Sequence, residues 1–343
     1  MRTRGLLFIV LLLILASGTV YLLKGGNSTP PQSKQESKQL FAELPVNDVA
    51  AVEIKSADRS VLIHRVDEHW TVADRFDYPA DYDRVANLLR GLHNAKSIRT
   101  FDGTDDTLSR LALKDLDANA QAAEKGTSVV LKDRTGKAIA GVLVGSERKS
   151  DQSPATGRYM RLGKERKVYL AEGRYDLYGA NPLEWMDRRL LNIAPENIRQ
   201  VLCYSADTNE LIFSLVSDAK GESLKPKDAQ FNFGPEDISL LSSSLTHLGA
   251  LDVFPADPEG KSNPDCAYSL EFVTFDDMVY RIYPSKTIGA NSQEEHQIRI
   301  DVACITSSGN EDCLRKANDM HVRFTPWIFK IDPYSYLRFV TSK

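Results

Sequence analysis

The sequence predicts an α+β fold, in which an N-terminal transmembrane helix precedes two similar domains that each combine an antiparallel sheet with a helix. Three features predict it: a charge-free apolar run at the N-terminus, a leucine-rich helical pattern that occurs twice, and pairs of strands rich in β-branched residues around each copy. The chain has 343 residues, of which 42% are hydrophobic and 26% are charged. This composition supports folded cores, and the length suits two domains of about 150 residues each.

The first expected element is the uncharged segment Leu6–Leu23, which follows two arginines in the first four residues. As a helix it would be about 27 Å long, close to the apolar thickness of a bilayer. The arginines favour a cytoplasmic N-terminus, which would place the rest of the chain outside. We therefore expect a transmembrane anchor over residues 1–24 and a flexible linker over residues 25–39. Cleavage as a signal peptide at Ala16-Ser17-Gly18 is the alternative, which we disfavour because the apolar run continues beyond it.

A unit of strand, strand, helix, hairpin and strand occurs twice. The first strands open with equally spaced apolar residues, Val49 and Val52 in one copy and Ile198 and Val201 in the other, and second strands follow over residues 60–66 and 210–216. We interpret the pattern as an internal duplication, with domains over residues 40–192 and 193–343. Chance similarity between two ordinary α+β domains is the alternative.

Each copy contains one amphipathic helix. In the first, Asp81 is a good N-cap residue, and the helix in the second opens with Gly234-Pro235. Apolar residues at helical spacing predict the buried faces, which are Val85, Leu88, Leu89 and Leu92 in the first copy and Ile238, Leu241, Leu245 and Leu248 in the second. Residues 178–192 are also predicted to be helical and to connect the domains.

Hairpins follow the helices. Residues 128–145 turn at Arg134-Thr135-Gly136, and residues 269–284 turn at Asp276-Asp277. The last strands of the first copy, residues 158–163 and 167–179, are then expected to correspond to residues 297–302, 321–324 and 327–340 of the second.

Four cysteines, Cys203, Cys266, Cys304 and Cys313, lie in the second half of the chain. An even number in an exported protein permits disulfides. Cys304 and Cys313 flank a turn-rich segment, so we expect a local bridge there, which would leave Cys203 to pair with Cys266. Four free, buried thiols are the alternative. The spacing matches no zinc site, because CxxC and paired histidines are absent.

The sequence contains no catalytic signature. It lacks GxSxG, HExxH, GxGxxG and the phosphate-binding loop GxxxxGK[ST]. His64 and His69 are five residues apart, a spacing that places them on opposite faces of a strand unless a turn intervenes. We therefore predict no catalytic, cofactor-binding or metal-binding residues and no enzymatic activity. A net charge of -4 without a basic cluster makes nucleic acid an improbable partner.

Several motifs resemble a bacterial family known as domain of unknown function 4340. They are HWTV at residues 69–72, YPADYDRVANLLRGL at 78–92, LVG at 143–145 and RYMRLGKERKVYLA at 158–171. An N-terminal anchor and a repeated domain are typical of that family, whose members are commonly encoded beside ABC-type transporters of the gliding-motility kind. The resemblance implies an accessory protein of the inner membrane, single-pass, with most of the chain in the periplasm, and it implies no catalytic residues.

Two functions follow as hypotheses. The first is a non-catalytic accessory protein, anchored through residues 6–23, that contacts the membrane subunits of an ABC-type transporter. The alternative is a periplasmic binding module for an envelope lipid or glycan, whose strands would line a groove. An enzyme is a third and weaker hypothesis, because no catalytic constellation was found.

Overall fold

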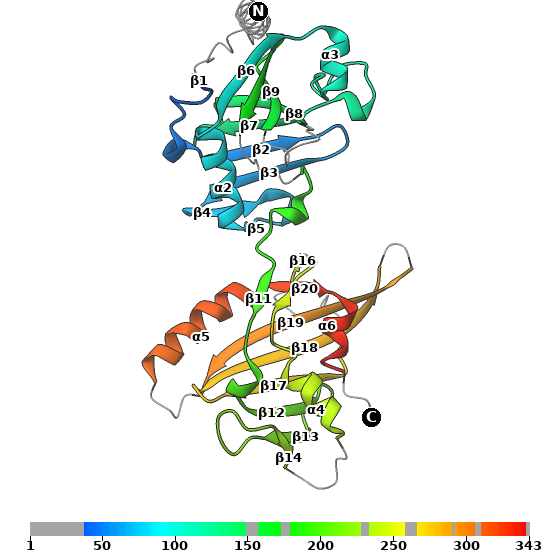
Figure 1. The fold of residues 1–343 in the computed structure, drawn as a ribbon. Coiled ribbons are helices and arrows are strands. Elements are labelled where there is room, and N and C mark those ends of the chain that lie inside the picture. Colours follow the sequence, from blue (N-terminus) through cyan, green and yellow to red (C-terminus); the bar gives the residue numbers. More distant parts are fainter. Residues whose placement is uncertain are drawn as a thin grey trace, which may run out of the picture.

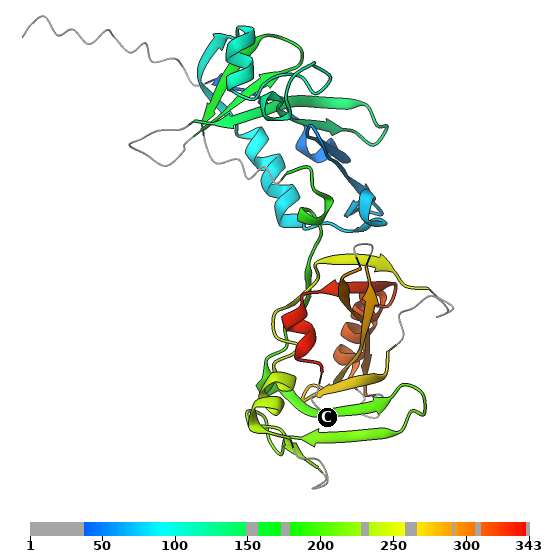
Figure 2. The same ribbon diagram turned by 90° about the vertical axis from the view of Figure 1, so that its right-hand side faces the viewer.

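A computed structural model describes residues 38–148, 157–172, 179–227, 233–257, 266–289, 292–305 and 310–340. These residues form two large antiparallel sheets and a few helices, which confirms the predicted α+β class. Figures 1 and 2 show the sheets one above the other, joined by the segment that carries β11. The predicted anchor Leu6–Leu23 lies outside the described residues. Within them, no helix has the length and apolar character to cross a membrane.

The first sheet has ten strands in the order β1-β6-β10-β9-β8-β7-β2-β3-β4-β5. It begins two residues before the expected domain start, because Lys38 and Gln39 pair with β6 rather than belonging to the linker. The strands are β1 (Lys38–Gln39), β2 (Ala51–Lys55), β3 (Ser60–Val66), β4 (His69–Val72), β5 (Tyr78–Pro79), β6 (Lys96–Asp102), β7 (Thr127–Lys132), β8 (Ala138–Glu147), β9 (Gly157–Leu162) and β10 (Lys167–Glu172).

Helix α2 (Tyr82–His93) packs on one face of this sheet, as the sequence predicts. The carboxylate of Asp81 accepts hydrogen bonds from the backbone N–H groups of Asp83 and Arg84, which satisfies the helix N-terminus. All four residues of the predicted stripe are buried with the inward residues of β2, β7 and β8. A shorter helix, α3 (Asp105–Arg110), lies in the connection between β6 and β7.

The second sheet has eight strands in the order β14-β13-β12-β17-β18-β19-β20-β16. Helices α4 (Pro235–Ser242), α5 (Glu311–Phe324) and α6 (Pro333–Leu337) contribute buried side chains to its core. The strands are β12 (Ile198–Ser205), β13 (Leu211–Val216), β14 (Lys225–Pro226), β16 (Asp252–Pro255), β17 (Tyr268–Thr274), β18 (Met278–Ile288), β19 (Glu294–Cys304) and β20 (Trp327–Ile331).

The two sheets share one strand order when each is followed in chain order. Strands β2, β3, β6, β7, β8, β9 and β10 of the first sheet hold the places of β12, β13, β16, β17, β18, β19 and β20 of the second. Val52 and Val201, which the sequence pattern aligned, are both fully buried. Both predicted hairpins form, β7 with β8 and β17 with β18.

Three expected elements differ from the structure. Residues 179–192 are not a long helix, because their backbone bonds outward: Asp187 N–H donates to Pro79 and Trp185 C=O accepts from Asp81. This segment contains only a 3-10 turn at Pro182–Glu184 and β11 (Arg189–Leu191), which pairs with β15 (Leu248–Gly249). Further 3-10 turns are Val46–Asp48, Ala73–Arg75, Ala122–Glu124 and Pro195–Asn197.

The other two differences lie in the second domain. Residues 321–324 end helix α5 instead of forming a strand, because Cys313, Ala317 and Phe324 are buried at helical spacing. Helix α4 ends at Ser242, so Leu245 and Leu248 lie beyond it although both are buried. The chain turns there because the backbone of Leu245 accepts a hydrogen bond from Ile193.

The domains contact each other through β5, the outermost strand of the first sheet, and β20, which lies between β19 and β16 in the second. The ring of Tyr78 meets those of Trp327 and Phe329 edge to face, at centroid distances of 5.3 and 6.2 Å. Burial raises the pKa of Tyr78 to about 12. An ion pair of 2.9 Å between Arg75 and Asp252 flanks these rings.

Candidate functional site

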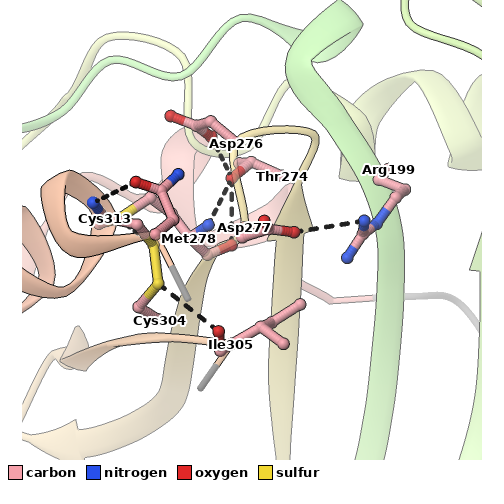
Figure 3. The surroundings of a disulfide bond; sticks show 9 residues. Arg199, Thr274, Asp276, Asp277, Met278, Cys304, Ile305 and Cys313 are labelled. Carbon is pink, nitrogen blue, oxygen red and sulfur yellow. Dashed lines mark hydrogen bonds and ion pairs between the residues drawn. A yellow bond between two sulfur atoms is a disulfide. The ribbon is translucent and has the colours of Figure 1, made fainter. Parts of the chain in front are cut away.

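Cys304 and Cys313 form a disulfide with a Cα–Cα distance of 5.8 Å. It joins the end of β19 to the first turn of α5, and both residues are buried (Figure 3). The side chain of Asn310 caps the helix by accepting from the backbone N–H of Cys313. The bridge therefore fixes the start of α5 against the sheet.

The pairing expected between Cys203 and Cys266 does not form, because Cys203 is a buried free thiol. On the neighbouring strand Cys203 lies opposite Leu270. Cys266 is four residues before Leu270, about 13 Å along the strand, which is beyond the reach of a disulfide. Burial raises the pKa of the Cys203 thiol to about 12. Cys203 is therefore part of the core.

The acidic pair Asp276-Asp277 belongs to the turn between β17 and β18, as predicted. Thr274 donates to the carboxylate of Asp276 at 2.5 Å and accepts from the N–H of Met278 at 3.1 Å. Asp277 forms an ion pair of 3.4 Å with Arg199 of β12 (Figure 3). A hollow of about 440 Å³ beside the turn is lined partly by Thr274, Asp276 and Tyr280. These carboxylates shape the hairpin.

Two histidine–aspartate pairs resemble part of a catalytic triad but lack its geometry. His321 Nδ1 lies 2.7 Å from Asp301 and 3.2 Å from Thr325 Oγ1, so one ring nitrogen serves both neighbours. His64 Nε2 lies 2.6 Å from Asp77. A triad needs the two ring nitrogens to contact different partners. Among the described residues, no group of three or more His, Cys, Asp or Glu side chains is placed to hold a metal ion.

The most distinctive polar site is a hollow of about 560 Å³ on the outer face of the second sheet. We call it the arginine groove. The neighbours of its residues along each strand, such as Cys203, Leu270 and Ile282, point into the core, so strand alternation directs the groove residues outward. Its principal side chains come from four adjacent strands and are Tyr204, Ser269, Glu271, Arg281, Tyr283 and Arg299.

The two arginines of the groove differ in their partners. Arg281 contacts Glu271 at 2.8 Å and Asp301 at 3.8 Å. Burial disfavours its charge, but Glu271, with a smaller contribution from Tyr283, outweighs that effect, so the pKa of Arg281 lies above its ordinary value. Burial, followed by the charge of Glu271, raises the pKa of Tyr204. Arg281 is thus neutralised within the protein.

Arg299 has no such counter-ion. Its guanidinium carbon lies 4.8 Å from the centroid of the Tyr283 ring, and in the described part of the chain no hydrogen bond or ion pair engages its charge. A guanidinium placed over an aromatic ring can still donate its N–H groups to a carboxylate or phosphate. The groove can therefore bind an anionic group.

The sequence patterns do not mark these groove residues as a site. Alternation in YRIYP and QIRID predicts that Arg281, Tyr283 and Arg299 point outward, which is the only trace of the site in the sequence. The packing of other segments over the sheet decides which outward positions form a hollow. That packing involves residues far apart in the sequence, so the local pattern does not predict it.

Comparison with known proteins identifies a family. A family model described as "Domain of unknown function (DUF4340)" matches residues 70–266, more than half of the chain. No curated protein and no solved structure matches the chain. The matched residues include the HWTV, YPADYDR and RYMRLG motifs, nearly in full, and they extend through the first domain into the second. The chain therefore belongs to the DUF4340 family.

Proposed function

We propose that this chain is a membrane-anchored, non-catalytic accessory protein whose two domains lie in the periplasm and contact an ABC-type transport system. The observation that carries the proposal is the Cys304–Cys313 disulfide in a chain whose N-terminus has an anchor-like apolar run. Structural disulfides persist in oxidising compartments such as the bacterial periplasm and are rare in the cytosol. The bridge thus supports the same side of the membrane as the arginines at the N-terminus do.

The two-domain architecture supports an internal duplication. Seven strands of each sheet occupy equivalent places, and the helices α2 and α4 occupy the same place in chain order. We infer that one sheet-and-helix unit was duplicated and that its copies then acquired different surfaces. Differentiated copies are suited to a scaffold in which one domain makes different contacts from the other.

The polar surface features support binding rather than catalysis. The described histidine–carboxylate pairs lack a nucleophile at the second ring nitrogen, and the arginine groove presents a cation without a counter-ion. A binding module for an envelope lipid is less well supported, because a lipid chain needs an apolar cavity and the groove is mainly polar. Binding of a glycan at the Arg299–Tyr283 pair is therefore one of the outcomes to be tested.

The test is purification of the tagged, full-length protein from its native membranes in mild detergent. We expect stoichiometric recovery of a permease and an ATPase. The same tag on an unrelated single-pass membrane protein is the control. Recovery of the chain alone, with a lipid or glycan identified by mass spectrometry, would reject the accessory function in favour of the binding module.

A test of sidedness is independent of any partner. Protease added to spheroplasts should digest the domains from outside, while a cytoplasmic control protein stays intact. Protection of the chain until the membrane is lysed would contradict a periplasmic location.

A further inference from the structure

Strand register makes Arg161 and Arg299 equivalent residues of the two domains. Arg161 of β9 pairs with Leu143 of β8 and Val168 of β10. Arg299 of β19 pairs in the same way with Tyr283 of β18 and Ile328 of β20. The strands concerned hold the same places in the two sheets. The two arginines therefore occupy one position on the same outer face.

In the first domain the chain itself covers this position. Residues 103–126, which we call the covering segment, pack Leu108 and Leu113 against Leu143 and Val168 in a separate buried cluster. Arg161 is only 2% exposed beneath this segment. Its guanidinium donates to the carbonyl oxygen of Leu113 at 2.9 Å and to the carboxylate of Asp115 at 2.9 Å. An apolar residue and an acidic residue two positions later thus cover this part of the sheet and engage the guanidinium of Arg161.

In the second domain the same position lies in the arginine groove. The connection between β16 and β17 is shorter, residues 256–267 against 103–126. Tyr283 replaces Leu143 as the neighbour of the arginine, and Arg299 stacks on its ring instead of binding a carbonyl and a carboxylate. Glu271 pairs with Arg281, and Asp301 contacts both Arg281 and His321. The groove therefore contains the equivalent cation, and among the described residues no carbonyl or carboxylate takes the place of Leu113 and Asp115.

We propose that the arginine groove binds an extended segment of a partner protein in which an apolar residue precedes an Asp or Glu by two positions. The carboxylate would accept hydrogen bonds from Arg299, and the apolar side chain would pack on Tyr283, as Asp115 and Leu113 do in the first domain. Arg299 is the cation of the groove that has no counter-ion within the described part of the chain. Charge complementarity therefore favours an acidic segment. The identity of this partner as a transporter subunit rests on the proposed function, whereas the chemistry of the groove does not.

A peptide copied from the covering segment tests this inference. The probe is the fluorescently labelled peptide LALKDLD, residues 111–117 of this chain, titrated into the full-length protein in detergent and followed by anisotropy. We expect saturable binding that Arg299→Ala weakens at least tenfold, the effect of removing a charge-assisted hydrogen bond. A peptide with Asn in place of the residue that copies Asp115 should lose a similar factor.

Two further variants keep the test interpretable. Arg315→Ala removes an exposed arginine on α5 of the same domain and should change peptide affinity less than twofold. Arg299→Lys retains the charge without the planar donor edge and should bind with intermediate affinity. Circular dichroism of each variant checks that the fold persists.

Absence of saturable binding at millimolar peptide would overturn the inference, and so would equal affinity of the wild type and Arg299→Ala. If the peptide does not bind, the permease and ATPase can still be recovered with the protein. A groove that binds no peptide and a chain that is not an accessory protein therefore give different results. Binding of a glycan that survives Arg299→Ala would likewise reject the acidic segment.

Discussion

The two domains treat one position of the same sheet in opposite ways. Arg161 is enclosed in the first domain, where its hydrogen bonds hold the covering segment in place. Arg299 is partly exposed in the second domain, where an aromatic ring is its one recorded partner in the described part of the chain. The same residue type in the same register therefore serves stability in one copy and remains available for binding in the other.

Glycine placement sharpens this difference. A Cβ built on Gly145 would lie 2.2 Å from the carbonyl oxygen of Leu111, so the covering segment runs directly over the backbone of β8. The register places Ser285 at the equivalent point of β18. Because Ser285 has a Cβ, another segment cannot run as close to the backbone of β18 as the covering segment runs to Gly145. The LVG motif at residues 143–145 is thus explained by the covering segment.

The largest expected effect separates the two arginines. Arg161→Ala should lower the free energy of unfolding of the first domain by about 3 kcal/mol, because the Leu113 carbonyl and the Asp115 carboxylate lose their partner. We place it at the low end of the range for buried pairs because the Asp115 side chain is 49% exposed. Arg299→Ala should cost only about 0.5 kcal/mol, the value of an exposed cation–π contact. Hydrogen exchange resolved by peptide measures each domain separately, and equal losses would contradict the comparison.

The disulfide gives a somewhat smaller effect, confined to the second domain. Replacing Cys304 and Cys313 together by Ser should destabilise that domain by about 2.5 kcal/mol, because a short loop is no longer closed in the unfolded chain. Urea unfolding with and without a reductant measures this loss in the wild type. Amide exchange in β7 and β8 is the internal control, and a comparable change there would show that the domains unfold as one unit.

The smallest effect concerns pH. Cys203 occupies the place of Ile54 in the first domain, so only the second core contains a thiol at this position. Its pKa is raised from 9.0 to about 12, so its stabilising contribution is complete below the ordinary pKa and is lost as pH rises between these values. Relative to Cys203→Val, the wild type should lose about 1.4 kcal/mol one pH unit above the ordinary pKa. An unchanged difference across this range would mean that the thiol titrates normally.

Local patterns predicted much of the fold. Helical spacing identified the buried face of α2, and Asp81 marked its start, because caps and periodicity act within a few residues. The segment 179–192 was predicted incorrectly because Asp187 and Trp185 form backbone hydrogen bonds with residues near Pro79, about a hundred positions away. Helix α5 was not predicted, and its last residues, 321–324, were assigned to a strand, whereas the burial of Cys313, Ala317 and Phe324 has helical spacing.

The candidate site was less predictable than the fold. MRL at residues 160–162 and IRI at 298–300 are nearly the same motif, yet one arginine is enclosed and the other lines a hollow. The difference is made by Leu113 and Asp115, which are far from either motif in sequence. Only the register of the strands relates these residues to one another.

The outermost strands of both sheets have a consequence for self-association. Exposed strand edges are templates for pairing with other chains, and proline or a very short strand blocks such pairing. Among the described residues, β5, β14 and β16 each contain a proline, at Pro79, Pro226 and Pro255, and β1 is two residues long. The edges of both sheets therefore resist the addition of foreign strands. At high local concentration the chain would in this way stay apart from its own copies.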